Sequence, residues 1–144
     1  KTTGKDITNY PGAGAAGGMG GGLLAFFNAE LKPGTELLLK AIDVSEKIKG
    51  ADLIITGEGK ADRQTAMGKV PYGILKEAQK EHIPVIVLAG SIENLPELNK
   101  AGFKGIFSIA PGPITLEKAM EPEFAKENIT RLVSQLYSVI TSFG

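Results

Sequence analysis

Four charged side chains that could act on a phosphate ester lie close together in the sequence: Glu58, Lys60, Asp62 and Lys69. Carboxylates can hold Mg²⁺ together with substrate phosphates, and a carboxylate can accept the proton of an attacking hydroxyl group. Lysines can neutralise the charge on a transferred phosphoryl group. The stretch therefore predicts phosphoryl-transfer chemistry or the binding of a small anion.

These charges follow residues 53–55, an apolar run with the length and composition of a buried strand. Ligands of open α/β sheets bind outside the carboxyl ends of the strands. Gly57 and Gly59 would let the backbone approach a ligand there, and Gln64 and Thr65 could donate hydrogen bonds to an oxygen-rich substrate. A run of charges is more often a solvated surface, but this position after a buried strand favours function.

Residues 12–22 form a second unusual stretch, in which seven of eleven residues are glycine. Residues 12–17 match the G-x-G-x-x-G pattern, but no strand precedes them, so we reject a dinucleotide-binding fold. We expect a helix over residues 17–28. Its glycine-rich start could hold an anion on free backbone amides or allow tight helix packing, and the sequence leaves both open. The candidate binding residues here are Gly12, Gly14, Gly17 and Gly18.

The composition excludes several classes of function. The chain has 144 residues, with 16 basic and 16 acidic residues and no cysteine. Balanced charge argues against nucleic-acid or anionic-membrane binding, and without cysteine there is no thiolate site. His82, the only histidine, is expected to be structural or exposed, so a zinc site is not expected. With no apolar run of the ~20 residues that a membrane span needs, we expect a soluble, cytoplasmic protein.

The pattern of apolar runs predicts an α/β fold. Residues 53–55, 84–89 and 105–109 read as strands, and unbroken apolar runs separated by helices are typical of parallel strands buried on both faces. Their carboxyl ends should meet at one edge of the sheet, beginning with a loop at residues 57–65. Further helices are expected at residues 35–42 (capped by Thr35, with Leu37, Leu38, Ala41 and Ile42 on one face), 45–49, from 71, 94–101 and 116–120 (capped by Thr115).

The last helix, after Pro122, is expected to pack on the sheet. The apolar stripe that predicts this is Ile129, Leu132, Val133, Leu136, Ile140 and Phe143. Three strands are few for a sheet of this type, and an open strand edge invites pairing. We therefore expect the chain to be a piece of a longer polypeptide.

Three ordered blocks of the chain resemble the bacterial glycerate kinase family. The blocks are Pro11-Gly12-Ala13-Gly14-Ala15-Ala16-Gly17-Gly18-Met19-Gly20; Ala51-Asp52-Leu53-Ile54-Ile55-Thr56-Gly57-Glu58-Gly59-Lys60, continued by Asp62, Gln64, Thr65, Gly68, Lys69, Val70, Pro71 and Gly73; and Phe107-Ser108-Ile109 with Gly112, Pro113, Leu116, Glu117, Ala119 and Met120. The resemblance covers essentially the whole chain. Ala61 departs from it, since a larger aliphatic residue is expected there, which concerns only the packing under the charged positions.

The resemblance implies an ATP-dependent kinase that phosphorylates D-glycerate to 2-phosphoglycerate, with 3-phosphoglycerate as the other product to consider. It implies a longer enzyme in which a flavodoxin-like αβα domain with a parallel sheet is interrupted by a second α/β domain. Residues 1–45 would be the tail of that inserted domain, and residues 46–144 the C-terminal half of the flavodoxin-like domain. The family's opening strand and its Asp-Ser-Phe-Lys loop are absent from this sequence.

Within that picture, Asp62 is the first candidate for the base or for Mg²⁺, and Glu58 is the second. Lys60 and Lys69 would neutralise phosphate or the carboxylate of glycerate. The missing N-terminal part of the same enzyme, or a second copy of the chain, would complete the structure, and this piece alone is expected to be inactive. The alternative is a non-catalytic module that binds phosphate or a sugar acid.

Overall fold

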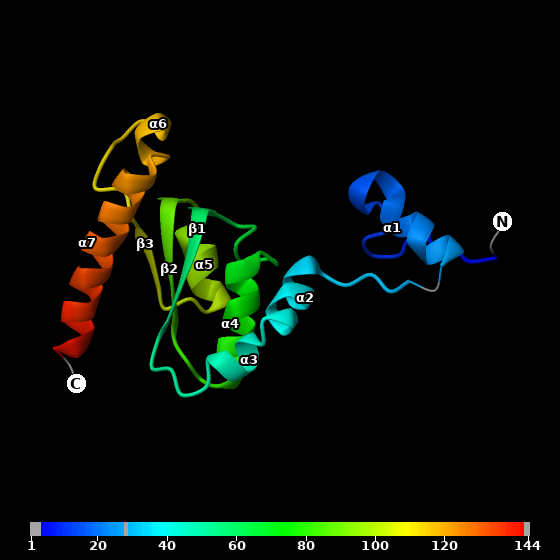
Figure 1. Cartoon of the computed structure of the whole chain (residues 1–144), viewed down its shortest axis with the longest axis horizontal. Helices are drawn as coiled ribbons and strands as arrows, with labels where there is room; N and C mark the ends of the chain where they lie inside the picture. Colours follow the sequence, from blue (N-terminus) through cyan, green and yellow to red (C-terminus); the bar gives the residue numbers. More distant parts are fainter. Residues whose placement is uncertain (1–3, 28, 143–144) are drawn as a thin grey trace. The chain divides into compact units, whose positions relative to one another are not determined.

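The computed structural model describes residues 4–27 and 29–142, which are coloured along the chain in Figure 1. The chain divides into two compact units, Lys1–Leu37 and Leu38–Gly144. In the described residues it is an α/β protein with seven helices and one three-stranded parallel sheet. No helix in this part of the chain combines the length and apolarity that a membrane crossing requires.

The first unit contains α1 (Ala15–Phe26), whose beginning differs from the predicted helix. Ala16, Gly17 and Gly18 all have positive φ angles (50°, 67° and 93°), so the chain makes a left-handed turn before the right-handed helix starts. The predicted helix start at Gly17 is therefore wrong, because both glycines there serve the turn. The predicted end at Asn28 lies outside the described residues, and the helix ends at Phe26.

Close packing accounts for two later glycines of the run. A Cβ atom on Gly20 would lie 2.6 Å from the carbonyl oxygen of Gly12, and one on Gly21 would lie 3.0 Å from Ile7 Cδ1. The backbone N–H of Gly21 donates a hydrogen bond of 2.8 Å to the carbonyl of Ala13. At Gly20 the helix thus approaches the turn before it too closely for a side chain, and at Gly21 the contact is tight.

Two short helices precede the sheet, α2 (Gly34–Ala41) and α3 (Val44–Lys47). Because α2 begins at Gly34, Thr35 lies inside its first turn, and the predicted Thr35 cap is wrong. The predicted apolar face of α2 is wrong as well: Leu39 is the buried residue, while Leu37, Leu38 and Ile42 are about half exposed.

The sheet has the order β1-β2-β3 and consists of β1 (Ile54–Ala61), β2 (Val85–Ile92) and β3 (Gly105–Ser108). All strand pairs are parallel, which confirms the prediction. The predicted loop at residues 57–65 is wrong in its first part, because β1 continues to Ala61 and pairs Lys60 with Ser91 of β2. Glycine allows this close pairing, since a Cβ atom on Gly90 would lie 2.8 Å from the Gly59 carbonyl oxygen.

Within residues 38–144, helices cover both faces of the sheet (Figure 1). On one face lie α4 (Val70–Lys80) and α5 (Leu95–Ala101). The buried core is on this side, and its members include Leu75, Ala78, Val85, Val87, Ala89, Leu98 and Phe103. This packing fixes the carboxyl end of β1 and the start of α4, which flank the predicted charged site.

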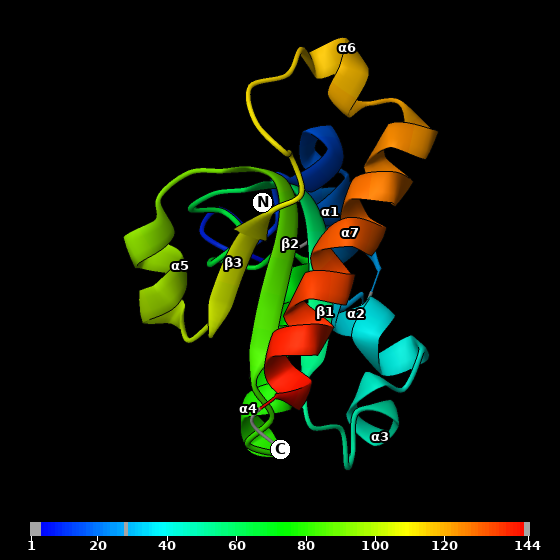
Figure 2. The same ribbon diagram turned by 90° about the vertical axis from the view of Figure 1, so that its left-hand side faces the viewer.

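The other face is crossed by α7 (Pro122–Thr141), as Figure 2 shows. Its predicted apolar stripe is only partly covered: Leu132, Val133 and Leu136 are half-buried, but Ile129 and Ile140 are 41% and 47% exposed. Phe143, the last member of that stripe, lies outside the described residues. Before α7, the short helix α6 (Leu116–Ala119) is capped by Thr115, as predicted, because the Thr115 hydroxyl accepts a hydrogen bond from the N–H of Lys118.

Candidate functional site

The candidate site lies where β1 ends and the chain turns toward α4. Three consecutive backbone hydrogen bonds of the i to i+3 type shape this turn: Thr65 to Asp62 (3.0 Å), Ala66 to Arg63 (3.2 Å) and Met67 to Gln64 (3.0 Å). Gly68 follows with a φ of +142°, and Lys69 is extended before the first residue of α4. The turn therefore returns the chain so that Lys69 comes back to the end of β1.

Three of the predicted charged residues meet there. The ammonium nitrogen of Lys69 lies 3.6 Å from Glu58 Oε1 and 3.4 Å from Asp62 Oδ1. The side chains of Lys69, Glu58 and Asp62 are 31%, 24% and 21% exposed, so the cluster is shielded but open to solvent. Two carboxylates from different parts of the stretch thus converge on one cation.

Asp62 is held by the turn itself. Its Oδ1 atom accepts hydrogen bonds from the N–H groups of Gln64 (2.9 Å) and Thr65 (3.2 Å) and from Lys69. Burial acts to raise the pKa of Asp62, but the Thr65 N–H, the Lys69 ammonium and the Gln64 N–H outweigh it and hold the pKa below its usual value. Among the described residues, every such bond ends on Oδ1, which leaves Oδ2 for a ligand.

Lys60 is placed apart from this cluster. Its ammonium nitrogen lies 2.8 Å from Glu93 Oε1, just beyond the end of β2, and the hydrogen bond with Glu93 raises the pKa of Lys60. The backbone N–H of Glu93 donates to the carbonyl of Ala61 at 2.8 Å, which fixes the pair beside the strand ends. Glu93 could not be predicted from the sequence, since only the register of β1 on β2 brings it near Lys60.

The polar residues of the turn differ in exposure. Gln64 is exposed, as a substrate-binding residue should be, whereas the side chain of Thr65 is completely buried. Gly57 and Gly59 belong to β1, and a side chain at either position would meet no close neighbour. A Cβ atom on Gly57 would lie 3.9 Å from the carbonyl oxygen of Leu88, and one on Gly59 would have nothing within 4 Å. Packing in the described structure therefore does not explain why these two positions are glycine.

In the first unit, the glycines predicted to bind an anion fall into two groups. Gly17 and Gly18 serve the left-handed turn, and Gly12 also has a positive φ of 85°. Gly14 has no neighbour within 4 Å of a hypothetical Cβ atom and ordinary backbone angles. Whether these backbone amides bind an anion stays a prediction.

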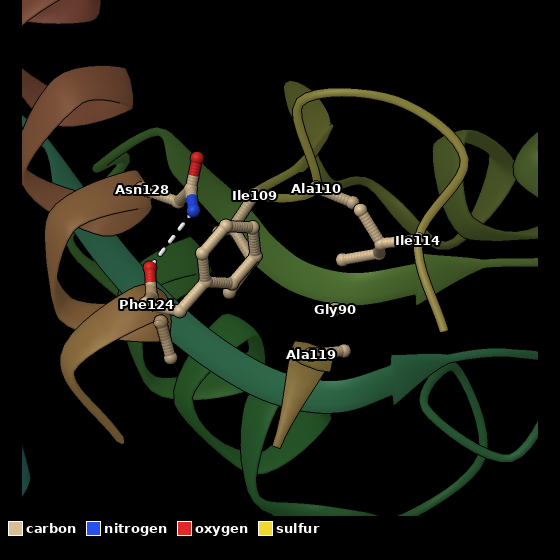
Figure 3. A pocket seen from close by; sticks show the side chains of 8 residues that line it. Gly90, Ile109, Ala110, Ile114, Ala119, Phe124 and Asn128 are labelled. Carbon is tan, nitrogen blue, oxygen red and sulfur yellow. Dashed lines mark hydrogen bonds between the residues drawn. The ribbon is translucent and has the colours of Figure 1, made fainter. Parts of the chain in front are cut away.

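A small cavity lies at the carboxyl edge of the sheet beside Gly90, between the residue 109–114 segment and α7 (Figure 3). Its volume is about 20 Å³, and its lining is mostly apolar. The one amide in the lining, Asn128, donates a 2.8 Å hydrogen bond to the carbonyl of Phe124 in its own helix. The cavity has room for about one water molecule, so it offers no binding site for a nucleotide or an acid.

The charged cluster has the chemistry of a site for a cation and an anion. Among the described residues, no group of three or more His, Cys, Asp or Glu side chains could hold a metal ion without help. Two carboxylates do suffice for Mg²⁺, which keeps several water ligands and takes others from substrate phosphates. The Lys69 ammonium already shows that Glu58 and Asp62 converge on a positive charge.

Comparisons with known proteins agree on the kind of protein to which this α/β chain is related. The family model described as "Glycerate kinase family" matches residues 1–141. A glycerate kinase of Halalkalibacterium halodurans is 45% identical over 119 residues, covering 82% of this chain and 31% of the relative. The glycerate 2-kinase of Escherichia coli K12 is 42% identical over 127 residues, covering 88% of this chain and 33% of the relative.

The fold comparison gives the same result. A crystal structure of a protein designated glycerate kinase 2, from Salmonella typhimurium LT2, matches with a TM-score of 0.69 and 38% identity over 91% of this chain and 33% of that one. The chain belongs to the glycerate kinase family. It spans about a third of the length of the curated relatives it matches.

Proposed function

We propose that this chain is the C-terminal part of a glycerate kinase, which transfers a phosphoryl group from ATP to D-glycerate. Membership of a kinase family implies the use of ATP. The favoured product is 2-phosphoglycerate, in keeping with the name of the Escherichia coli relative, glycerate 2-kinase, and 3-phosphoglycerate is the alternative. The observation that carries the proposal is the convergence of Glu58 and Asp62 on Lys69 at the carboxyl end of β1.

In this proposal, the two acids and the lysine have different roles. The lowered pKa of Asp62 makes its carboxylate a weak proton acceptor but a persistent negative charge, which favours cation binding over the role of general base. Glu58 and Asp62 would hold Mg²⁺, which would neutralise charge on the phosphates of ATP. Lys69 would balance the two acids and could face the carboxylate of glycerate, while the exposed Gln64 could donate hydrogen bonds to the substrate.

Lys60 takes a lesser role in this proposal than the sequence alone indicated. Its charge is already matched by Glu93, so it can attract the phosphates of a nucleotide only at longer range. The amides of residues 12–18 and the backbone at Gly57 and Gly59 remain candidates for close contact with phosphate.

The fold of the complete enzyme is part of the same proposal. Residues 46–144 would supply the C-terminal half of a flavodoxin-like αβα domain, and residues 1–45 the tail of a second, inserted domain. The parallel sheet of three strands with helices on both faces supports the first part. We place the enzyme in the cytoplasm, with the rest of the same polypeptide or a second copy as its structural partner, and with no nucleic-acid or membrane partner.

Substitution of Asp62 tests the proposal. In the full-length enzyme, Asp62→Asn should reduce turnover of D-glycerate by about 10²–10³-fold, because it removes a charge that the reaction requires. The matched control is Asp52→Asn, which makes the same change at an exposed position before β1 and should leave turnover unchanged. If turnover of the Asp62 variant stays within about threefold of the wild type, Asp62 has no part in the chemistry.

A further inference from the structure

Thr65 is the one polar residue of the turn that has no exposed surface. A buried hydroxyl needs hydrogen-bond partners, and this one has two. Its Oγ1 atom accepts a hydrogen bond of 3.1 Å from the backbone N–H of Asp62 and donates one of 3.4 Å to the carbonyl of Lys60. Both partners belong to the end of β1 and the first residue of the turn, so the hydroxyl is directed at the backbone.

Asp62 in turn accepts a hydrogen bond from Thr65. Its Oδ1 atom accepts the N–H of Thr65 at 3.2 Å, while the backbone carbonyl of Asp62 accepts the same N–H at 3.0 Å. Such an exchange between a first residue and the residue three positions later is the arrangement of a capping box, which fixes the first turn of a helix. Here it fixes a short turn whose first residue carries the candidate catalytic carboxylate.

We propose that Thr65 is a positioning residue of the phosphoryl-transfer site: its buried hydroxyl locks the turn that holds the Asp62 carboxylate at the end of β1. Thr65 acts through Asp62 and does not touch the substrate. The effect of Thr65 on kinetics rests on the proposed function. The hydrogen bonds themselves do not, because they form without any ligand.

Two substitutions separate the hydroxyl from the rest of the side chain. Thr65→Val keeps the shape but leaves the half-buried N–H of Asp62 without its acceptor, whereas Thr65→Ser keeps the hydroxyl. In the full-length enzyme, Thr65→Val should lower kcat for D-glycerate by about 10–10²-fold with little change in KM, because a displaced carboxylate fails in the transition state. Thr65→Ser should restore kcat to within about threefold of the wild type.

A second readout does not depend on kinase activity. Amide hydrogen exchange, followed by NMR, should be at least about tenfold faster at Asp62 and Thr65 in the valine variant and normal in the serine variant. The matched control is Thr115→Val, which removes a similar hydroxyl cap from α6. It should speed exchange at Lys118 and leave kcat unchanged.

The outcomes are distinct. If Thr65→Val raises KM with kcat unchanged, Thr65 contacts substrate directly and the inference is wrong. It is equally wrong if exchange at Asp62 stays within about twofold of the wild type. Should the valine variant not fold, Thr65→Ala removes the same hydroxyl, and the same criteria apply. A wild-type enzyme that does not phosphorylate glycerate refutes the proposed function, while the exchange comparison still decides the role of Thr65.

Discussion

At the scale of single residues, Lys69 determines the charge balance of the candidate site. It is the cation nearest to both Glu58 and Asp62 among the contacts of the described residues. Without it, two carboxylates that each lie within 3.6 Å of its ammonium nitrogen would lose their shared counter-charge in a space only partly open to water, and like charges near each other repel. Lys60, by contrast, is paired with Glu93 and half exposed. The two lysines, equivalent in the sequence, are therefore not equivalent in the structure.

This difference leads to a test with a built-in control. In the full-length enzyme, Lys69→Met should lower kcat/KM for D-glycerate by about 10²-fold or more, because it removes the charge that balances the acids and could face the substrate. Lys60→Met should lower it by less than about tenfold. Steady-state kinetics with both substrates varied would show this. Equal losses in the two variants would mean that the Lys69 cluster has no special role.

Also at this scale, the sequence predicted which charged residues lie together better than it predicted the partner of Lys60. Glu58, Asp62 and Lys69 could be grouped from the sequence because they flank the end of one strand. The pairing of Lys60 with Glu93 could not, since it depends on the register of two parallel strands separated by a whole helix. The burial of Thr65 was also missed, although an Asp followed three residues later by a hydroxyl is a possible capping pattern.

At the scale of elements, the glycines of α1 no longer form one uniform class. Gly20 is needed for close packing, Gly21 makes a tight contact, and Gly17 and Gly18 form a left-handed turn. Gly22 lies in the right-handed part of the helix with nothing within 4 Å of a hypothetical Cβ atom. The sequence could not separate these positions, because a glycine required by backbone angles, by packing or by a ligand looks the same in one sequence.

Two alanine substitutions check this division. Gly20→Ala should destabilise the first unit by about 1–3 kcal/mol, because its Cβ atom would collide with the Gly12 carbonyl oxygen at 2.6 Å. Gly22→Ala should leave the helix unchanged or stabilise it by up to ~1 kcal/mol, the usual advantage of alanine over glycine in a helix. Amide hydrogen exchange within α1 of the intact chain measures the change in stability caused by each substitution. Unchanged exchange in Gly20→Ala would contradict the packing explanation. A loss of turnover in Gly22→Ala at normal stability would support a ligand near the backbone.

Two predictions about the elements were wrong, one on the end of a strand and one on the buried face of a helix. The sequence predicts a first strand that ends at Ile55, yet β1 continues through Gly57 and Gly59 because β2 pairs with it to Ala61. Similarly, α2 buries Leu39 where the helical pattern indicated Leu37 and Leu38. Strand pairing decided the first case against local preference. The number of strands, their parallel direction and the helix after Pro71 depended on long apolar runs and a favoured proline position, and these predictions were confirmed.

At the scale of the whole molecule, the sheet offers an edge for further structure. In the described residues β1 pairs only with β2, so its other edge carries backbone groups without a neighbouring strand. Such an edge can pair with another segment or another chain. The half-exposed apolar side chains on α7 could likewise be covered by another segment or another chain. These features agree with a chain that spans about a third of its curated relatives.

The chain of 144 residues should therefore bind its ligands weakly or not at all and should not turn over glycerate. In the proposed function, its charged cluster supplies only part of a site, because phosphoryl transfer needs both substrates held in line by groups that converge from several directions. Calorimetry with ATP-Mg²⁺ and with D-glycerate, beside a coupled assay of ADP release, separates the possibilities, and light scattering shows whether two copies pair. Tight binding of either ligand without turnover, in place of weak or absent binding, would favour the non-catalytic module. ADP release by the chain within about tenfold of the rate of the full-length enzyme would show that the cluster at the end of β1 is sufficient, and that the remaining two thirds of the family's length are not needed for the chemistry.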